Sequence, residues 1–251
     1  MQQAEFDGKG SRIRWTEVPG AQPARVYLHG LGSMSAVYHA HIAARPELAG
    51  RRSLFMDLPG HGTSDRPEHF GYTLEEHADA VAVALDQADV TGAELIAHSM
   101  GGAVAVVLAH RRPDLVSRLV LTEANLDPFP PQTAASSGIA AYGEDEFVEK
   151  EYARVLDRVG PLWAATMRLA DPRALHRSAV GLRRGSEPMM RTILEGLGID
   201  RVYLQGEHSG ELPGRQKLEA AGVRVLTVPG AGHNVMFDNP DAFVAAVAGR
   251  C

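Results

Sequence analysis

The sequence has almost no cysteine, and this lack excludes two kinds of structure. The only cysteine is Cys251, the last of 251 residues, so no disulfide can form within the chain and no cysteine-based metal site is available. The sequence also lacks an apolar run long enough to span a membrane, and its first residues lack the basic cluster and apolar stretch of a signal peptide. We therefore expect a soluble, cytoplasmic protein that does not act at a membrane.

An excess of basic residues is absent as well. The 25 lysines and arginines are outnumbered by 31 aspartates and glutamates, which gives a formal net charge of −6. This balance offers no electrostatic basis for binding nucleic acid. A glycine-rich nucleotide-binding motif and a cluster of metal ligands are also missing, so we expect neither a cofactor nor a metal ion. The sequence does not indicate an oligomeric state.

Short apolar runs alternate with longer helix-like segments along most of the chain. We predict strands near residues 25–28, 53–56, 94–97, 118–121, 201–204 and 223–228, and helices near residues 74–88, 101–110 and 240–248. The apolar runs show little polar alternation, which is typical of strands that are buried on both faces of a parallel sheet. The sequence therefore predicts an α/β protein with a mostly parallel central sheet flanked by helices.

The alternation is interrupted between residues 125 and 197. This segment opens with a proline-rich turn at residues 127–131 and continues with helix-like sequence at residues 144–160 and 161–172. We predict that residues 125–197 form a helical cap inserted into a core made of residues 1–124 and 198–251. The alternative is that these helices simply cover the sheet.

A serine stands where a predicted strand runs directly into a glycine-rich helix. The stretch is ELIAHSMGG, residues 94–102, with Ser99 flanked two residues away by Ala97 and Gly101. A serine on such a tight strand-to-helix turn needs small neighbours, because larger side chains would collide. The helix behind it directs free amides and the positive end of its dipole at the hydroxyl. We predict that Ser99 is a nucleophile; the alternative is a serine that only caps the helix.

Four motifs, in the expected order, resemble those of the α/β-hydrolase superfamily. The turn around Ser99 resembles the GxSxG motif, with Ala97 in the place of the first glycine, and we expect the turn to tolerate the extra methyl group. The other three are LHGLG at residues 28–32, DLPGHGTSD at residues 57–65, and GAGH at residues 230–233 followed by NPDAF at residues 239–243. The resemblance extends from about residue 24 to the C-terminus, and it implies the α/β-hydrolase fold.

The resemblance also assigns roles to individual residues. It implies that His233 is the general base that takes the proton from Ser99, and that the backbone amides of Leu31 and Met100 form an oxyanion hole. A glycine-rich loop and a helix N-terminus can supply such donors without reorganisation during the reaction. Four further residues of these motifs are expected to hold their own turns: His29, Asp57, His61 and Ser64.

The third member of the triad must be a carboxylate that orients the imidazole. Most members of the superfamily carry an aspartate in a G-x-x-D pattern after the penultimate strand, but Ser209 occupies that position here. The strand after the nucleophile helix ends in Glu123, which resembles a subset that includes some haloalkane dehalogenases and lactone-cleaving hydrolases. Both strand ends lie along the same edge of a parallel sheet. We predict Glu123 as the acid, with Glu207 and Asp127 as alternatives.

Apolar residues of the predicted cap are candidates for the substrate-binding wall: Phe129, Leu162, Trp163, Met167, Met189 and Met190. Methionine and aromatic side chains suit a medium-sized apolar group, although such residues also hold the helices of a cap together.

The favoured function is hydrolysis of a small-molecule carboxylic ester or lactone through an acyl-enzyme, on a Ser-His-Glu triad. Thioesters and carbon–carbon bonds of activated diketones use the same groups, and a receptor-like binding protein would keep the pocket without turnover. Epoxide hydrolases and haloalkane dehalogenases carry an aspartate nucleophile, so Ser99 argues against both.

Overall fold

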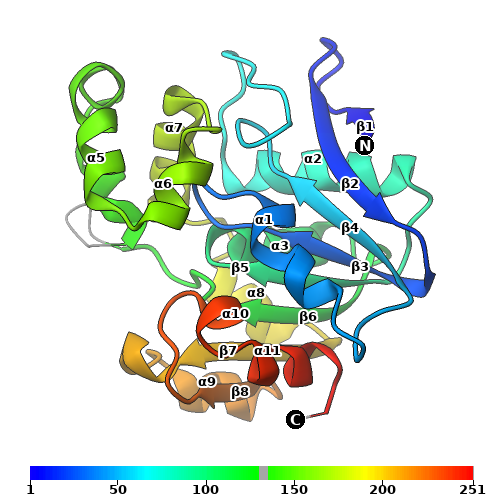
Figure 1. Ribbon diagram of the computed structural model, residues 1–251. Helices are drawn as coiled ribbons and strands as arrows, with labels where there is room; N and C mark the ends of the chain where they lie inside the picture. The colour runs from blue at the N-terminus through cyan, green and yellow to red at the C-terminus, as the bar shows by residue number, and fades with distance from the viewer. Residues whose placement is uncertain (130–134, 251) are drawn as a thin grey trace.

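The computed structural model describes residues 1–129 and 135–250. Pro130 and Pro131 of the predicted proline-rich turn, and Cys251, lie outside these ranges. Within them, eight strands form one sheet in the order β1-β2-β4-β3-β5-β6-β7-β8 (Figure 1). The strands are β1 (Gln2–Glu5), β2 (Arg12–Val18), β3 (Ala21–Leu28), β4 (Arg51–Asp57), β5 (Ala93–His98), β6 (Val116–Thr122), β7 (Asp200–Gly206) and β8 (Arg224–Val228).

Strands β3 to β8 are parallel to one another, and β1 and β2 extend the sheet with antiparallel pairs. The parallel strands overlap the six predicted apolar runs, so the prediction of a mostly parallel sheet is confirmed. The two antiparallel strands were not predicted. In β2 only alternate residues, Ile13 and Trp15, are buried, which gives a weaker apolar signal than the continuous runs of the central strands.

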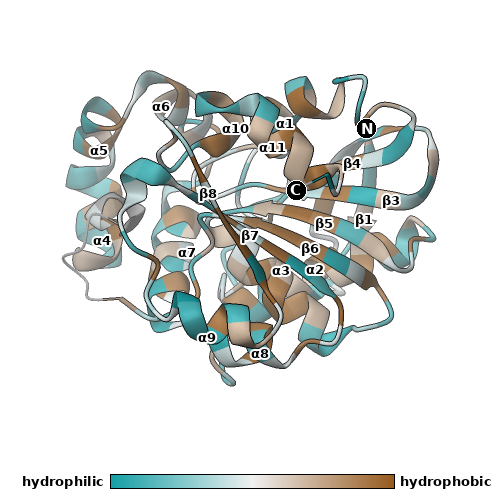
Figure 2. Ribbon diagram, turned by 90° about the horizontal axis from the view of Figure 1, so that it is seen from below, coloured by the Kyte–Doolittle hydropathy of each residue, from teal (hydrophilic) through white to brown (hydrophobic). Residues whose placement is uncertain are grey.

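Helices cover both faces of the sheet (Figures 1 and 2). One face carries α2 (Leu74–Gln87), α3 (Met100–Arg111), α8 (Met190–Gly196) and α9 (Arg215–Ala220), and the other carries α1 (Ser35–Ala43), α10 (Val235–Asp238) and α11 (Pro240–Val247). Successive strand residues point to opposite faces, so Leu95 belongs to the apolar cluster under α2 and α3 while Ile96 belongs to the cluster under α1 and α11. This arrangement explains why the central runs contain few polar residues.

Local signals fix where the core helices begin. At the start of α2 the Thr73 hydroxyl accepts from the amide of Glu76 at 3.2 Å, and the Glu76 carboxylate accepts from the amide of Thr73 at 3.0 Å. This reciprocal capping satisfies two amides that the helix leaves unpaired. At the start of α11 the Asn239 side chain accepts from the amide of Ala242 at 3.1 Å. The helices predicted near residues 74–88, 101–110 and 240–248 are confirmed as α2, α3 and α11.

Between β6 and β7 the described residues form a series of short helices. They are the 3-10 helix η1 (Ala135–Ala141), α4 (Glu144–Glu146), the π-helix η2 (Phe147–Glu151), α5 (Tyr152–Arg158), α6 (Pro161–Met167), α7 (Pro172–Arg184) and α8. In Figure 1, α5, α6 and α7 stand together to one side of the sheet. In contrast, α8 packs against the core helices α3 and α9. We propose that the cap ends with α7 and that α8 covers the sheet.

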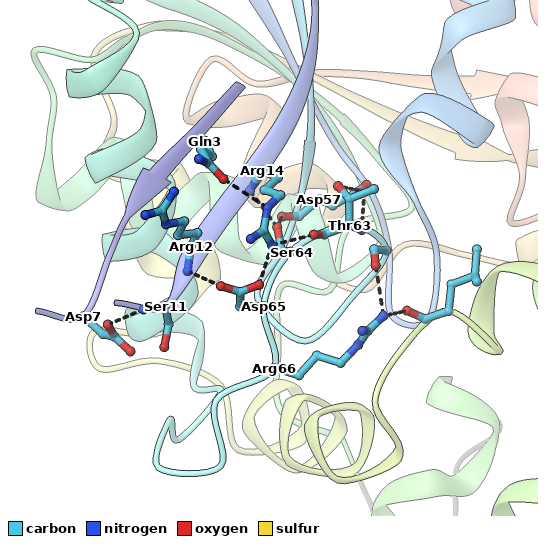
Figure 3. A network of polar contacts seen from close by, with 12 residues as sticks. Gln3, Asp7, Ser11, Arg12, Arg14, Asp57, Thr63, Ser64, Asp65 and Arg66 are labelled. Atoms are coloured by element: carbon cyan, nitrogen blue, oxygen red, sulfur yellow. Dashed lines mark hydrogen bonds and ion pairs between the residues drawn. The ribbon is translucent and has the colours of Figure 1, made fainter. Parts of the chain in front are cut away.

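The turn after β4 is held by its own polar side chains (Figure 3). The Asp57 carboxylate accepts from the amide and the hydroxyl of Thr63, each at 3.0 Å, and the Ser64 hydroxyl donates to the Asp57 carbonyl at 2.5 Å. The Ser64 oxygen in turn accepts from the amide of Arg14 in β2 at 2.8 Å. These contacts agree with the turn-forming roles expected for Asp57 and Ser64.

The same turn also holds the chain that follows α6. Arg66 donates from one guanidinium nitrogen to the carbonyls of Gly62, at 3.0 Å, and Leu169, at 2.6 Å. The amide of Asp171 donates to the carbonyl of Gly60 at 2.9 Å. The segment between α6 and α7 is therefore attached to the core. None of the described helices is both long enough and apolar enough to cross a membrane.

Candidate active site

Ser99 occupies the sharp turn between β5 and α3. Its backbone has a φ of +51° and a ψ of −120°, a conformation that is strained for any residue with a side chain. The amide of Ser99 donates to the carbonyl of Thr122 in β6, and its carbonyl accepts from the amide of Gly102, both at 2.9 Å. The turn forms with Ala97 in the place of the usual glycine, as expected from the sequence.

The helix after Ser99 packs so closely on the sheet that positions 101 and 102, its second and third residues, have room only for glycine. A Cβ atom on Gly101 would lie 2.4 Å from the carbonyl oxygen of His29 and 2.8 Å from that of Leu28. A Cβ atom on Gly102 would lie 2.4 Å from the Cβ of Ala124. The steric requirement inferred for position 101 is therefore confirmed, and the contact is with backbone that cannot move aside.

The hydroxyl of Ser99 donates to Oδ1 of Asn125 over 3.4 Å. Asn125 follows β6 two residues after Glu123, and it lines the same cavity as Ser99. This contact was not predicted from the sequence, because residue 125 was expected only to begin the cap. Its position only two residues after Glu123 could have indicated that it lies near the site.

Glu123, directly after β6, and His233, in the loop after β8, approach each other across the end of β7. Oε2 of Glu123 lies 3.6 Å from Nδ1 of His233, and Oε1 accepts from the amide of Gly206 at 2.6 Å. Glu123 has a φ of +50°, and its amide donates to the carbonyl of Leu204 at 2.9 Å. A Cβ atom on residue 206 would lie 2.4 Å from the carbonyl oxygen of Gly232. Glycine at that position therefore lets the loop that carries His233 approach β7.

The two alternative carboxylates are bound elsewhere. Glu207 accepts from the amide of Gly230 at 2.8 Å, and Asp127 pairs with Arg191 through three side-chain hydrogen bonds of 2.6, 2.9 and 3.1 Å. Among the described residues, Glu123 is the one carboxylate with an ion-pair contact to the imidazole of His233.

His98 holds the backbone of the histidine loop. Its Nε2 lies 2.9 Å from the carbonyl oxygen of His233, and the two rings are 4.8 Å apart. Burial lowers the pKa of His98 well below its usual value, so the ring is neutral near pH 7. Because a carbonyl oxygen can only accept, Nε2 carries the proton and donates it to His233. This role of His98 was not predicted from the sequence.

The amides expected to form an oxyanion hole have no other partner. Leu31 lies in the loop after β3, and Met100 is the first residue of α3. Neither amide has a hydrogen-bond acceptor in the part of the chain that the structure describes. The loop passes directly against the nucleophile, because a Cβ atom on Gly30 would lie 3.1 Å from the Cβ of Ser99.

His29 and His61 are buried behind this loop. The amide of Leu58 donates to Nε2 of His29 at 3.0 Å, so Nδ1 carries the proton and donates to the carbonyl of Gly30 at 2.7 Å. Burial lowers the pKa of His29 to about 4 and that of His61 to about 3. Neither ring lines the cavity, which agrees with the structural roles expected for both.

Ser99, Glu123 and His233 lie on the wall of one cavity of about 660 Å³. Leu31 also lines it, whereas Met100 is fully buried behind the turn. No group of three or more potential metal ligands occurs among residues 1–129 and 135–250. The cavity wall therefore brings together a hydroxyl, an imidazole and a carboxylate beside the loop of Leu31, and a hydroxyl, an imidazole and a carboxylate are the side-chain groups used in acyl transfer.

A family model described as alpha/beta hydrolase fold matches residues 26–178. The chain belongs to this family. It is 29% identical to the sn-1-specific diacylglycerol lipase ABHD11 of Mus musculus, over 90% of this chain and 80% of that protein. It is 31% identical to the esterase Rv0045c of Mycobacterium tuberculosis, over 81% of this chain and 64% of that protein. The fold also matches an esterase from Exiguobacterium antarcticum with a TM-score of 0.79 at 21% identity, covering 98% of this chain and 97% of the other.

Two of the predicted wall residues of this α/β hydrolase line its cavity, namely Phe129 and Trp163. The other four do not. Leu162 is 39% exposed at the surface of α6, Met189 is half-buried, and Met167 and Met190 are fully buried in the core. The side chain of Met167 points at the loop after β3, where its Cε would lie 3.2 Å from a Cβ atom on Gly32. The structure therefore places none of these four on the cavity wall: Met167 and Met190 pack in the apolar core, and Leu162 meets solvent.

The wall of the cavity of this hydrolase also includes polar and charged side chains that were not predicted to lie there. It is lined by Asp127, Arg191, Gln205, Ser209 and Glu211. Gln205 is near the end of β7, and the others come from the segments after β6 and β7 and from the start of α8. They are far apart along the chain, so no local motif marked them as neighbours.

Proposed function

We propose that the protein is a serine hydrolase that cleaves a carboxylic ester or a lactone through an acyl-enzyme. Ser99 is the nucleophile, His233 the general base and Glu123 the acid that orients the imidazole. The observation that carries the proposal is the 3.6 Å separation between Nδ1 of His233 and Oε2 of Glu123, on the wall of the cavity that also holds Ser99. Relatives named as an esterase and a lipase support the same class of reaction.

The first step forms the acyl-enzyme. Oγ of Ser99 attacks the carbonyl carbon of the ester while its proton passes to Nε2 of His233, and the carbonyl electron pair moves onto oxygen. Glu123 stabilises the imidazolium through Nδ1. The free amides of Leu31 and Met100 stabilise the oxyanion, because donors fixed in place before the reaction need no reorganisation. The bond to the alcohol then breaks, and the alcohol leaves with the proton held on Nε2 of His233.

The second step releases the acid. A water molecule gives a proton to His233 and attacks the acyl carbon, and the bond to Oγ of Ser99 breaks as the proton returns to that oxygen. The products of an open-chain ester are a carboxylic acid and an alcohol. A lactone keeps its alcohol attached to the acyl chain, so the product is a single hydroxy acid.

The test compares wild type with Ser99→Ala on p-nitrophenyl acetate, p-nitrophenyl butyrate and a panel of lactones. We expect Ser99→Ala to lose on the order of 10³-fold or more in kcat, with Ser117→Ala, an exposed serine of β6, as the matched control. A burst of p-nitrophenol equal to the enzyme concentration would identify the acyl-enzyme. If wild type is no faster than Ser99→Ala on any of these substrates, the hydrolase proposal fails and a binding protein is the better explanation.

Thioesters and activated diketones are assayed in the same series. The acetyl and butyryl thioesters match the two oxygen esters in acyl group, so the ratio of kcat/KM values compares the leaving groups. A preference of more than about tenfold for the oxygen ester supports the proposed substrate class. A preference of that size for the thioester, or for a diketone, would reassign it.

A further inference from the structure

Helix α6 of the cap donates two hydrogen bonds to the loop after β3. Nε1 of Trp163 donates to the carbonyl of Leu31 at 2.7 Å, and the hydroxyl of Thr166 donates to the carbonyl of Gly32 at 2.9 Å. Trp163 and Thr166 are three residues apart on a helix, so their side chains lie on the same face. Two consecutive carbonyls of the loop are thus bound by one face of one cap helix.

The two carbonyls belong to a tight turn of four residues. The amide of Ser33 donates to the carbonyl of Gly30 at 3.1 Å, and Gly32, the third residue of the turn, has a φ of +68°. A positive φ at the third position is what a type II turn requires. Type I and type II turns differ chiefly in the direction of the central peptide, whose carbonyl here is that of Leu31. The hydrogen bond from Trp163 therefore selects one orientation of that peptide.

Glycine at position 32 is also what lets the helix approach so closely. A Cβ atom there would lie 2.9 Å from Nε1 of Trp163 and 3.2 Å from Cε of Met167. The loop has glycine on both sides of Leu31, and glycine has the least intrinsic backbone preference of all residues. The conformation of Leu31 is therefore fixed by hydrogen bonds: His29 and Ser33 hold the carbonyl of Gly30, and α6 holds the carbonyls of Leu31 and Gly32.

We propose that Trp163 and Thr166 are positioning residues for the oxyanion hole, which hold the carbonyl side of Leu31 while His29 and Ser33 hold the peptide that carries its amide. This inference rests on the proposed hydrolase function, since it assigns the Leu31 amide a role in the reaction. The chain after α6 is fixed to the core through Arg66 and Asp171. A movement of α6 away from the loop would therefore break the two hydrogen bonds while Leu169 and Asp171 stay attached to the core.

The proposal predicts where the kinetic effect falls. The oxyanion exists only in the transition state and the tetrahedral intermediate, so a misplaced donor lowers kcat and leaves KM nearly unchanged. Thr166 is buried and does not line the cavity, so its hydroxyl has no substrate contact to lose. A KM effect at this position would therefore not come from direct binding.

The decisive variant is Thr166→Val, which keeps the shape of the side chain and removes the donor. We expect kcat for p-nitrophenyl butyrate to fall roughly tenfold with KM within about twofold, because a small displacement of a catalytic group has effects of this size. Thr166→Ser keeps the hydroxyl and should restore kcat to within about threefold of wild type. Leu169→Ala, an exposed residue just after α6, is the control for nonspecific disturbance of the cap.

Trp163→Phe is the second variant, since it keeps an aromatic ring on the cavity wall and removes the N–H. An alkylboronic acid supplies an independent readout, because its tetrahedral adduct with Ser99 places an anionic oxygen where the oxyanion forms. Both variants should bind the boronic acid about tenfold more weakly, while binding of the carboxylic acid product stays unchanged. Thermal melts establish that each variant is folded.

The two proposals fail in different ways. If Ser99→Ala abolishes turnover but Thr166→Val and Trp163→Phe keep wild-type kcat and boronic acid affinity, the hydrolase proposal stands and the positioning role is wrong. The role is also wrong if kcat and product affinity fall together, or if Thr166→Ser is as slow as Thr166→Val. If wild type shows no turnover that depends on Ser99, both proposals fail.

Discussion

Gly206 donates its backbone amide to Oε1 of Glu123 over 2.6 Å. This hydrogen bond occupies one carboxylate oxygen and leaves Oε2 directed at Nδ1 of His233, 3.6 Å away. Glu123 follows β6 and Gly206 ends β7, so the contact joins two neighbouring strand ends. The carboxylate is held by backbone on the side away from the imidazole, which restricts its movement during proton transfer.

Glu123→Gln should lower kcat for p-nitrophenyl butyrate by about 10²-fold or more. The amide keeps the size of the side chain but does not stabilise the imidazolium, and loss of the equivalent charge is costly in serine hydrolases. Glu207→Gln is the matched control and should stay within about threefold of wild type, because Glu207 binds the Gly230 amide and not His233. If Glu207→Gln collapses while Glu123→Gln keeps its activity, the assignment of the acid is reversed.

His98→Phe should lower kcat about tenfold with a smaller change in KM. Phenylalanine keeps a ring beside Tyr38, which stacks on His98 at a centroid distance of 5.8 Å, but it removes the donor to the His233 carbonyl. A less restrained loop samples more orientations of the imidazole, which lowers the fraction of reactive complexes. His110→Phe, on the exposed end of α3, should leave kcat unchanged. Equal rates for the two variants and wild type would contradict the role.

Gly101→Ala should destabilise the protein by about 1–3 kcal/mol and reduce ester turnover. The added methyl group would meet the carbonyl oxygen of His29 at 2.4 Å, so α3 and the nucleophile must shift away from the sheet. Gly196→Ala is the control, because a Cβ atom there meets no atom within 4 Å and alanine favours the helix by up to about 1 kcal/mol. Urea denaturation measures both. Equal stability of the two variants would show that the approach at Gly101 is looser than 2.4 Å implies.

Stability should fall as the pH is lowered from about 6.5 towards 4. Burial lowers the pKa of five histidines, those of His29 to about 4 and of His39 and His61 to about 3, with His77 and His98 lowered as well. Below pH 6.5 the unfolded chain protonates these rings while the folded state keeps them neutral, so unfolding takes up protons. Above pH 6.5 these histidines are neutral in both states, and the folded protein has its full stability. As the pH falls below 6.5, each histidine lowers the free energy of unfolding by about 1.4 kcal/mol per pH unit.

Urea denaturation at pH 7.5, 6.5, 5.5 and about 4.5 measures this dependence. His39→Phe, which replaces a buried ring in the cluster with Tyr27 and Phe243, should reduce the slope by about 1.4 kcal/mol per pH unit. His110→Phe removes an exposed histidine and should leave the slope unchanged. A free energy of unfolding that is constant between pH 6.5 and 4.5, measured in the same series, would show that these histidines titrate normally in the folded state.

The central strands and the nucleophile turn could be predicted because their signals are local. Six short apolar runs that alternate with helix-like segments indicate buried strands of a parallel sheet. Small residues around Ser99 are needed because larger ones would clash with neighbouring backbone. The antiparallel strands β1, at the edge of the sheet, and β2 beside it escaped prediction because each buries few residues. The cap wall was predicted in part, since apolar residues that pack a cap look the same in sequence as those that line a cavity.

The acid illustrates the limit of the sequence most clearly. Glu123, Glu207 and Asp127 all follow a predicted strand, and spacing alone does not tell which carboxylate reaches His233. In the structure Asp127 pairs with Arg191, and Glu207 accepts from the Gly230 amide, so neither contacts His233. Arg191 and Gly230 are distant along the chain from the carboxylates that they bind. Asn125 and His98 were missed for the same reason, because their contacts with Ser99 and His233 cross between elements.

The sequence by itself determined the parallel core, the strained turn at Ser99 and the family, because apolar runs and steric requirements are written in adjacent residues. Only the tertiary structure decided which carboxylate faces His233 and which cap residues face the cavity. It alone brought Trp163 and Thr166 against the loop of Leu31. These contacts depend on the relative positions of strand ends and helices that are up to 135 residues apart in the chain, as between His98 and His233, and no local pattern encodes such positions.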